Sequence, residues 1–168
     1  MQFVNTPPRK ESGYFTYNDK QNGFEIMYSQ DDFKPFVNEN LNNVFSVTLD
    51  VDKYFAGTIL QLSQFVISSE PRSPRADCYD ALADTYYSTK ETINGISFKK
   101  YVWHDAATGT AAELVNYMTM HNDKCYQISI RTLYVRLSKH PDIGLKDFSR
   151  SVLYTKYYRL LNTFKFTE

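Results

Sequence analysis

The sequence predicts an α+β domain whose central antiparallel sheet is sandwiched between helices. Most apolar segments alternate with polar residues at period 2, which is typical of half-buried strands, whereas two segments carry an apolar stripe at helical spacing. Most joins are too short for the crossovers that parallel strands need, so we expect an antiparallel sheet. With 168 residues, 42% of them apolar, the chain is long enough for one domain with a core.

The first twelve residues predict a flexible N-terminal arm, and residues 13–168 a single domain. The arm is polar and contains Pro7 and Pro8, which lack backbone donors and favour an extended chain. No composition shift or low-complexity tract divides the rest of the chain.

Four strands are predicted before the first helix, at 14–17, 24–28, 44–49 and 58–68. Residues 24–28 and 44–49 alternate with period 2, whereas 14–17 is a short aromatic segment and 58–68 is rich in β-favouring residues. The dipeptide Asn22-Gly23 joins the first two as a hairpin, because both residues tolerate positive φ. Residues 30–43 are polar and are expected to form a loop. The strand at 58–68 is apolar on both faces, which favours a central position in the sheet.

The second half of the chain predicts a three-strand meander and a terminal strand, at 92–103, 112–120, 126–131 and 163–166. Two helices complete the fold. Residues 76–87 carry Cys78, Leu82 and Tyr86 at spacings of four, and residues 145–161 carry a broad apolar face of period 3.6.

The apolar faces of these elements predict the core. The residues expected to be buried are Phe24, Ile26, Phe45, Val47, Leu62, Phe98, Tyr126, Ile128, Ile130, Phe148, Val152 and Leu160.

The charge balance and the hydropathy pattern exclude several function classes. The 19 basic and 19 acidic residues cancel, which argues against a nucleic-acid binder or a polybasic membrane adaptor. No apolar run is long enough for a transmembrane helix, and the first residues do not have the pattern of a signal peptide.

Several segments together resemble PsbP/Mog-type domains. They are the hairpin ending in Asn-Gly-Phe-Glu-Ile-Met-Tyr, the strand Ile-Asn-Gly-Ile-Ser-Phe, the meander ending in Cys-Tyr-Gln-Ile-Ser-Ile and the last helix running into Leu-Leu-Asn-Thr-Phe-Lys-Phe. The resemblance covers about residues 13–168 and implies an antiparallel sheet sandwiched between helices. It also implies a binding or assembly protein rather than an enzyme, since members include a photosystem II subunit, a Ran-binding factor and bacterial lipoproteins of unassigned role. The alternative is another curved-sheet fold, of the cystatin or nuclear-transport-factor-like type, but these usually have a long helix near the N-terminus.

Cys78 and Cys125 could form a disulfide that ties the first helix to the meander. Strand alternation places Cys125 on the face opposite Tyr126 and Ile128, where it could meet a helix. The alternative, two buried thiols that behave as small apolar residues, stays open. Their spacing does not fit a zinc site.

The three histidines predict no metal site and no cofactor. His104 and His121 lie in expected turns at opposite ends of the strand 112–120, about 25 Å apart, so they cannot share a metal. They are expected to be exposed turn residues, and no phosphate-binding, dinucleotide or nucleophile-elbow motif occurs.

The excess of aromatic residues, 14 Tyr and 12 Phe, predicts a non-catalytic binding module for a protein partner or a small ligand. The candidate binding residues are Tyr86 and Tyr87 at the helix end, and Tyr101 and Trp103 on one strand face. The alternative function is a small hydrolase or isomerase that uses a Cys–His pair.

The location expected from the polar arm and from the resemblance to lipoproteins is extracytoplasmic, either periplasmic or lipid-anchored. The targeting segment or lipid anchor would then lie outside this sequence. The initial Met1 leaves a cytoplasmic protein as the alternative.

Overall fold

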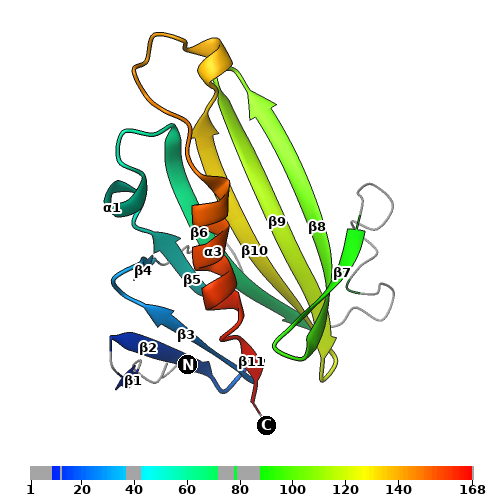
Figure 1. The fold of residues 1–168 in the computed structure, drawn as a ribbon. Coiled ribbons are helices and arrows are strands. Elements are labelled where there is room, and N and C mark those ends of the chain that lie inside the picture. The colour runs from blue at the N-terminus through cyan, green and yellow to red at the C-terminus, as the bar shows by residue number, and fades with distance from the viewer. Residues whose placement is uncertain (1–8, 12, 37–42, 72–77, 79–87, 168) are drawn as a thin grey trace.

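The computed structural model describes residues 9–11, 13–36, 43–71, 78 and 88–167, which form a mostly β fold (Figure 1). The larger sheet has seven antiparallel strands in the order β4-β5-β6-β10-β9-β8-β7. These strands are β4 (Phe33–Pro35), β5 (Asn43–Leu49), β6 (Leu60–Pro71), β7 (Ser88–Ile93), β8 (Ile96–Ala107), β9 (Thr110–His121) and β10 (Lys124–Val135).

A smaller sheet and the helices complete the described structure. The smaller sheet has the order β1-β2-β3-β11. Its strands are β1 (Arg9–Glu11), β2 (Tyr14–Asp19), β3 (Phe24–Ser29) and β11 (Lys165–Phe166). The helices are α1 (Val51–Phe55), α3 (Arg150–Leu161) and the 3-10 helix η1 (Leu137–Lys139). Strand β1 lies in the segment predicted to be a flexible arm, where it pairs with β2.

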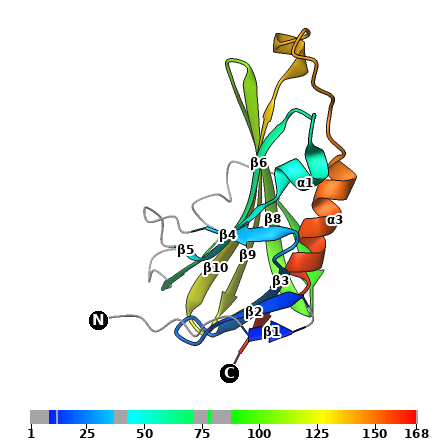
Figure 2. The same cartoon turned by 90° about the vertical axis from the view of Figure 1, so that its left-hand side faces the viewer.

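The predicted sandwich between helices is wrong, and so is the α+β sandwich that the resemblance to PsbP/Mog-type domains implies. Figure 2 shows α1 and α3 on the same side of the large sheet. In the described part of the chain no helix covers the opposite face. The helix predicted at 76–87 lies outside the described residues except for Cys78, which is in a turn.

One reason for the higher strand content is a hairpin inside the segment predicted as a single strand at 92–103. Asn94 and Gly95 have φ angles of +49° and +78°, and the chain reverses at them between β7 and β8. This is the geometry that Asn-Gly favours in a two-residue hairpin. The reversal adds β7 as an edge strand to the large sheet.

The last helix is shorter than the predicted 145–161, because the backbone before it is bonded elsewhere. The Lys146 N–H donates to the Gly57 carbonyl (3.1 Å), and the Lys146 carbonyl accepts from the Ile59 N–H (2.8 Å). The Ser149 side chain then caps the helix by accepting from the Val152 N–H.

The segment predicted as a loop at 30–43 contributes β4 to one edge of the large sheet. Phe33 is buried, and its ring centroid lies 5.6 Å from that of Tyr157 on α3. Pro35 ends the strand, and an edge position suits a residue that has no backbone donor.

The core lies between the large sheet, α3 and the small sheet. The structure confirms burial for ten of the twelve predicted core residues, namely Phe24, Ile26, Phe45, Val47, Phe98, Tyr126, Ile128, Ile130, Phe148 and Leu160. The prediction is wrong for Val152, which is 47% exposed on the side of α3 away from Leu153. It is also wrong for Leu62, which is only half-buried because it alternates with the inward-facing Ser63.

A partly buried ion pair beside α1 joins the turn before β4 to α3. The Lys156 Nζ lies 3.2 Å from the Asp32 carboxylate and 3.3 Å from the centroid of the Tyr54 ring. The Tyr54 hydroxyl donates to the same carboxylate. Burial alone would raise the pKa of Asp32, but the hydrogen bonds from Tyr54 and Lys156 outweigh it, and the pKa falls below its ordinary value of 3.8.

Truncation of a fully buried residue of β10 should destabilise the fold strongly. We expect Ile128→Ala to lower the free energy of unfolding by about 2–5 kcal/mol, because it leaves a cavity in the core. The control Val152→Ala, on the exposed side of α3, should change it by less than about 0.5 kcal/mol. Urea unfolding followed by circular dichroism measures both; equal losses in the two variants would contradict the assignment of the faces.

The Asp32–Lys156 pair should make stability depend on pH in the acid range. A carboxyl group whose pKa is lowered in the fold stabilises it above the ordinary value of 3.8, and this stabilisation disappears as the pH falls through the lowered pKa. Lys156→Met should therefore destabilise the protein at pH 7 and progressively less below pH 3.8. Urea unfolding across this pH range, with Lys139→Met as an exposed control, tests this prediction. If the loss of stability in Lys156→Met were independent of pH, the ion pair would not be its cause.

Candidate functional site

A cleft lies where two neighbouring strands of the large sheet separate. The pairing of β8 with β9 runs from Ala107 down to Lys99, where Lys99 lies opposite Met118. Beyond this point the end of β8 stays with β7, while the end of β9 stays with β10. A cleft of about 700 Å³ opens between the separated ends, near the small sheet.

The lining of the cleft combines apolar, aromatic and basic side chains. It is made up of Lys90, Gly95, Ile96, Ser97, Phe98, Lys99, Thr119, Met120, His121 and Phe166. Three strands of the large sheet and the last strand of the small sheet therefore contribute to it. Met120 is 44% exposed.

Aromatic rings form one wall of the cleft. The rings of His121 and Phe166 stack with their centroids 3.9 Å apart and their planes inclined by 8°. Tyr126 packs edge-on against Phe166 at 4.9 Å, so the core supports this wall from behind. Strand β11 is held in place by its pairing with β3 and by an ion pair between Lys165 and Glu25 (2.8 Å).

A side-chain hydrogen bond crosses the fork between β8 and β9. The Thr119 hydroxyl donates to the Ser97 carbonyl over 2.9 Å. The Ser97 carbonyl therefore faces across the fork toward β9. This bond takes the place of a backbone ladder between the two strands at this point.

The charges near the cleft are divided between the two faces of the sheet. Lys90 on β7 lies directly opposite Lys99 on β8, so both side chains project from the same face. Glu91 projects from the other face, where its carboxylate lies 3.0 Å from the Lys100 Nζ. The acidic side chain next to Lys90 is therefore paired away from the cleft.

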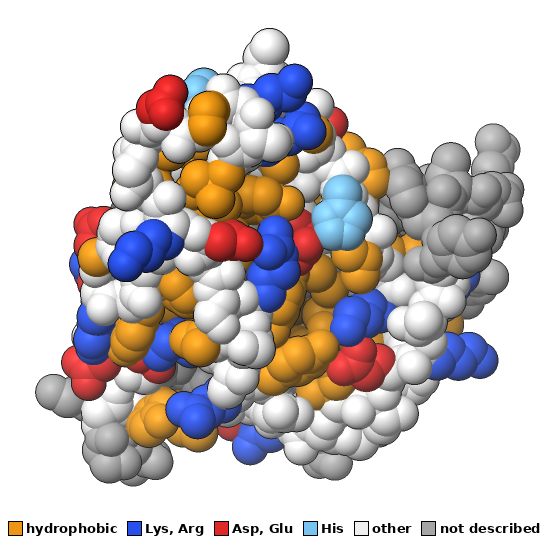
Figure 3. Space-filling model, turned by 45° about the horizontal axis from the view of Figure 1, so that its top comes forward, with side chains coloured by type: hydrophobic (Ala, Val, Ile, Leu, Met, Phe, Trp, Pro, Cys, Tyr) orange, Lys and Arg blue, Asp and Glu red, His pale blue; other side chains and the backbone are white. Residues whose placement is uncertain are grey.

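Figure 3 shows a hollow on one face of the molecule, with hydrophobic side chains along it and charged side chains around it. The face of the sheet that carries α3 also has a polar cluster. The Lys100 Nζ donates to Glu91 and to the Tyr158 hydroxyl (3.1 Å), and it lies over the Tyr117 ring. Burial raises the pKa of Tyr117, with a further contribution from Tyr158. Because these groups satisfy one another, we regard the cluster as structural.

The structure describes two of the four residues of the predicted aromatic binding surface, Tyr101 and Trp103. Tyr101 and Trp103 share one face of β8, but Tyr101 is only 2% exposed and Trp103 is partly buried. Tyr101 therefore cannot present its ring to a partner. Tyr86 and Tyr87 lie outside the described residues.

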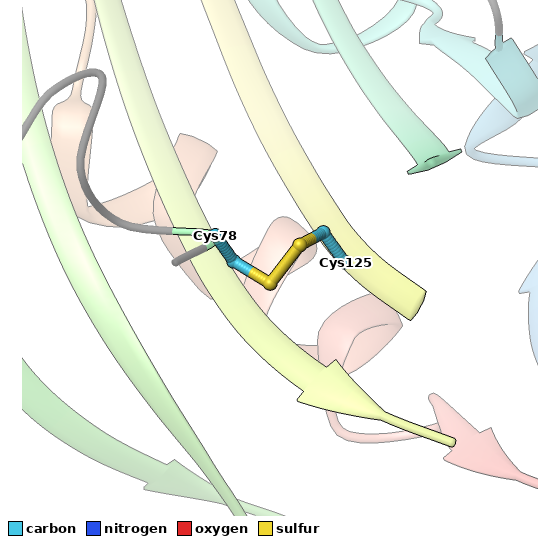
Figure 4. The surroundings of a disulfide bond; sticks show 2 residues. All are labelled: Cys78 and Cys125. Carbon is cyan, nitrogen blue, oxygen red and sulfur yellow. A yellow bond between two sulfur atoms is a disulfide. The ribbon is translucent and has the colours of Figure 1, made fainter. Parts of the chain in front are cut away.

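Cys78 and Cys125 form a disulfide, with their Cα atoms 5.4 Å apart (Figure 4). Cys125 lies on the face of β10 opposite the buried Tyr126 and Ile128, as strand alternation predicts. The bond ties Cys78, in the connection between β6 and β7, to β10. With both sulfur atoms bonded, neither is available as the nucleophile of a Cys–His enzyme.

The described histidines have different surroundings. The His104 Nδ1 lies 3.4 Å from the carboxylate of Glu113 and belongs to β8 rather than to a turn. His121 is partly buried in the cleft wall, in contrast to the exposed turn residue that the sequence predicts. Within the described residues, no three His, Cys, Asp or Glu side chains are grouped so that they could hold a metal ion.

Comparison with known proteins supports the fold alone. The sequence matches no family model, and no curated protein is similar to it. A crystal structure of a protein from Bacteroides thetaiotaomicron VPI-5482 has a TM-score of 0.55 at 11% sequence identity. The match covers 91% of this chain and 48% of that chain, so this chain spans about half the length of the matched protein.

No helix in the described part of the chain has the length and apolar character needed to cross a membrane.

Sequence reasoning missed the residues of the cleft. Lys90, Met120 and Phe166 come from strands that are far apart in the sequence, and only the strand order brings them together. The one local signal was the dipeptide Asn94-Gly95, because recognising its turn would have placed Lys90 opposite Lys99.

Reduction of the disulfide should destabilise the protein. Cys78 and Cys125 are 47 residues apart, so the loop-closure model predicts a loss of about 3–4 kcal/mol on reduction. Urea unfolding with and without dithiothreitol measures this difference. The double variant Cys78→Ser/Cys125→Ser should show a similar loss and no response to dithiothreitol; an equal stability of oxidised and reduced wild type would argue against the bond.

Proposed function

We propose that this protein is a non-catalytic binding module that holds a small ligand in the cleft between β8 and β9. The observation that carries the proposal is a cleft of about 700 Å³ with an aromatic wall. Ligand sites in proteins typically have volumes of 300–1,000 Å³, apolar linings and a few polar groups that orient the ligand. The cleft combines these features in Met120, Phe166 and Ser97.

The contacts of the polar lining residues favour binding over catalysis. His121 stacks on Phe166, and the Thr119 hydroxyl donates to the Ser97 carbonyl. The described contacts thus include no hydrogen bond between a hydroxyl and the imidazole, which nucleophilic catalysis would use. The Cys–His alternative is not supported either, because both cysteines are bonded.

We also propose that the protein works in an extracytoplasmic, oxidising compartment. The disulfide supports this location, because such bonds persist in oxidising compartments and are rare in the cytosol.

Binding of a neutral planar fragment tests the proposed function. We expect 2-naphthalenemethanol to shift the amide resonances of Gly95, Met120 and Phe166 in the ¹⁵N-labelled protein, because these residues line the cleft. Ser97→Trp should fill the cleft and abolish these shifts. Met120→Trp serves as a second filling variant if the first is poorly folded.

The matched control is Gln61→Trp, which places the same side chain at an exposed position of β6 outside the lining. This variant should bind the fragment like the wild type. Shifts scattered over the surface, or unchanged binding in both filling variants, would refute the proposed function.

A further inference from the structure

The hairpin between β7 and β8 determines which backbone groups of β8 point into the cleft. Hydrogen-bonded and non-hydrogen-bonded pairs alternate along an antiparallel ladder, and the two residues that flank a two-residue turn form a hydrogen-bonded pair. These residues are Ile93 and Ile96, so the peptide groups of the next residue, Ser97, point away from β7 and toward β9. The hydrogen bond from the Thr119 hydroxyl to the Ser97 carbonyl agrees with this direction.

The hairpin between β9 and β10 gives the same result on the other side of the cleft. His121 and Lys124 flank its turn, so the N–H and the carbonyl of Met120 point away from β10 and toward β8. Ser97 and Met120 would form the next hydrogen-bonded pair between β8 and β9, but the pairing of the two strands ends before it. Met120 therefore presents a donor and an acceptor to the cleft in the arrangement of a strand edge.

Contacts at the end of β8 hold the two strands apart. The Asn94 side-chain amide, in the turn between β7 and β8, donates to the Phe164 carbonyl over 3.0 Å. Behind it, the ring centroid of Phe98 lies 6.2 Å from that of Phe164. A Cβ atom built on Gly95 would meet no described atom within 4 Å, so the space in front of the turn is open. The gap next to Met120 is therefore part of the folded structure.

The lining differs on the two faces of the sheet, and an extended peptide would match this difference. Met120 and His121 are successive residues of a strand, so their side chains project to opposite faces. A peptide residue opposite Met120 would place its side chain next to that of Met120. The residue before it would lie opposite His121, and its side chain would point to the wall that His121 forms with Phe166.

We propose that the ligand of the cleft is a short extended peptide with an aromatic side chain, which adds as a strand to the free end of β9. This inference rests on the proposed function of the cleft. One peptide residue exchanges two backbone hydrogen bonds with Met120, and the ring of the preceding residue packs against His121 and Phe166. In β-strand addition such main-chain bonds give affinity, and side-chain pockets give specificity.

Three compounds that differ at one backbone position test the main-chain contact. They are acetyl-Phe-Ala-amide and its two esters, in which oxygen replaces the N–H of either the alanine or the phenylalanine unit. Each is titrated against the ¹⁵N-labelled protein, and we expect the peptide to shift the amide resonances of Gly95, Met120 and Phe166.

The two esters should differ in affinity. The alanine ester should bind about five- to tenfold more weakly than the peptide, because it cannot donate to the Met120 carbonyl. The phenylalanine ester should bind like the peptide, because alternation along the strand directs that N–H away from β9.

The variant Met120→Pro removes the donor on the protein side. The Met120 N–H points away from β10, so its loss leaves the ladder with β10 intact. The matched control Met120→Ala shortens the side chain and keeps the N–H. We expect the peptide to bind Met120→Pro about fivefold more weakly than Met120→Ala. In contrast, 2-naphthalenemethanol has no peptide group and should bind the two variants equally.

The outcomes separate this proposal from the proposed function. Affinities that do not fall selectively for the alanine ester, or equal binding of the peptide to Met120→Pro and Met120→Ala, would overturn the strand addition and leave the binding cleft standing. The ester comparison uses the wild-type protein, so it decides the matter even if Met120→Pro does not fold. If neither the peptide nor 2-naphthalenemethanol shifts the resonances of the cleft residues, both proposals fail.

Discussion

The register of β10 is the constraint on which the rest of the described structure depends. This strand pairs along its whole length with β9 and along nearly all of it with β6. Because side chains alternate, one register directs Ile128 and Ile130 into the core and Cys125 to the opposite face. A slip of one residue would exchange the two faces, so core, disulfide and small sheet all require the same pairing.

The same register connects the two sheets. Tyr126 is buried under the small sheet, and its hydroxyl donates to the Asn22 carbonyl in the turn between β2 and β3. Phe24 packs against both Tyr126 and Phe164, which continues the contact to the C-terminal strand. The aromatic residues in which the chain is so rich therefore serve largely to join the sheets, and fewer remain for a surface.

The periodicity of the sequence predicts the strands well because burial on one face dictates it directly. The alternation of Phe24 and Ile26, and that of Tyr126, Ile128 and Ile130, corresponds to residues that are buried in the structure. Periodicity predicts the wrong structure where backbone hydrogen bonds to another segment determine the conformation. The periodic segment before Arg150 is apolar enough for a helix, yet the backbone of Lys146 pairs with the segment around Gly57.

The candidate site could not be predicted in the same way, since it arises from the point at which two strands stop pairing. Nothing in the local pattern around Lys99 or Met118 marks the end of that ladder. The aromatic residues chosen from composition, Tyr101 and Trp103, lie on a predicted strand face, but their exposure depends on what packs against that face. Periodicity predicts which residues share a face, whereas a cleft depends on how neighbouring strands end.

The disulfide also has a consequence for how the chain folds. The pairing of β6 with β10 begins where Pro71 meets Lys124, and β7, β8 and β9 lie between these strands in the sequence. Long-range pairings of this kind are slow to form because the entropy of loop closure opposes them. Cys78 follows shortly after Pro71, and Cys125 is adjacent to Lys124. In the oxidised chain the pairing of the large sheet with the longest connection thus becomes a nearly local one, so the covalent bond shortens the conformational search as well as stabilising its result.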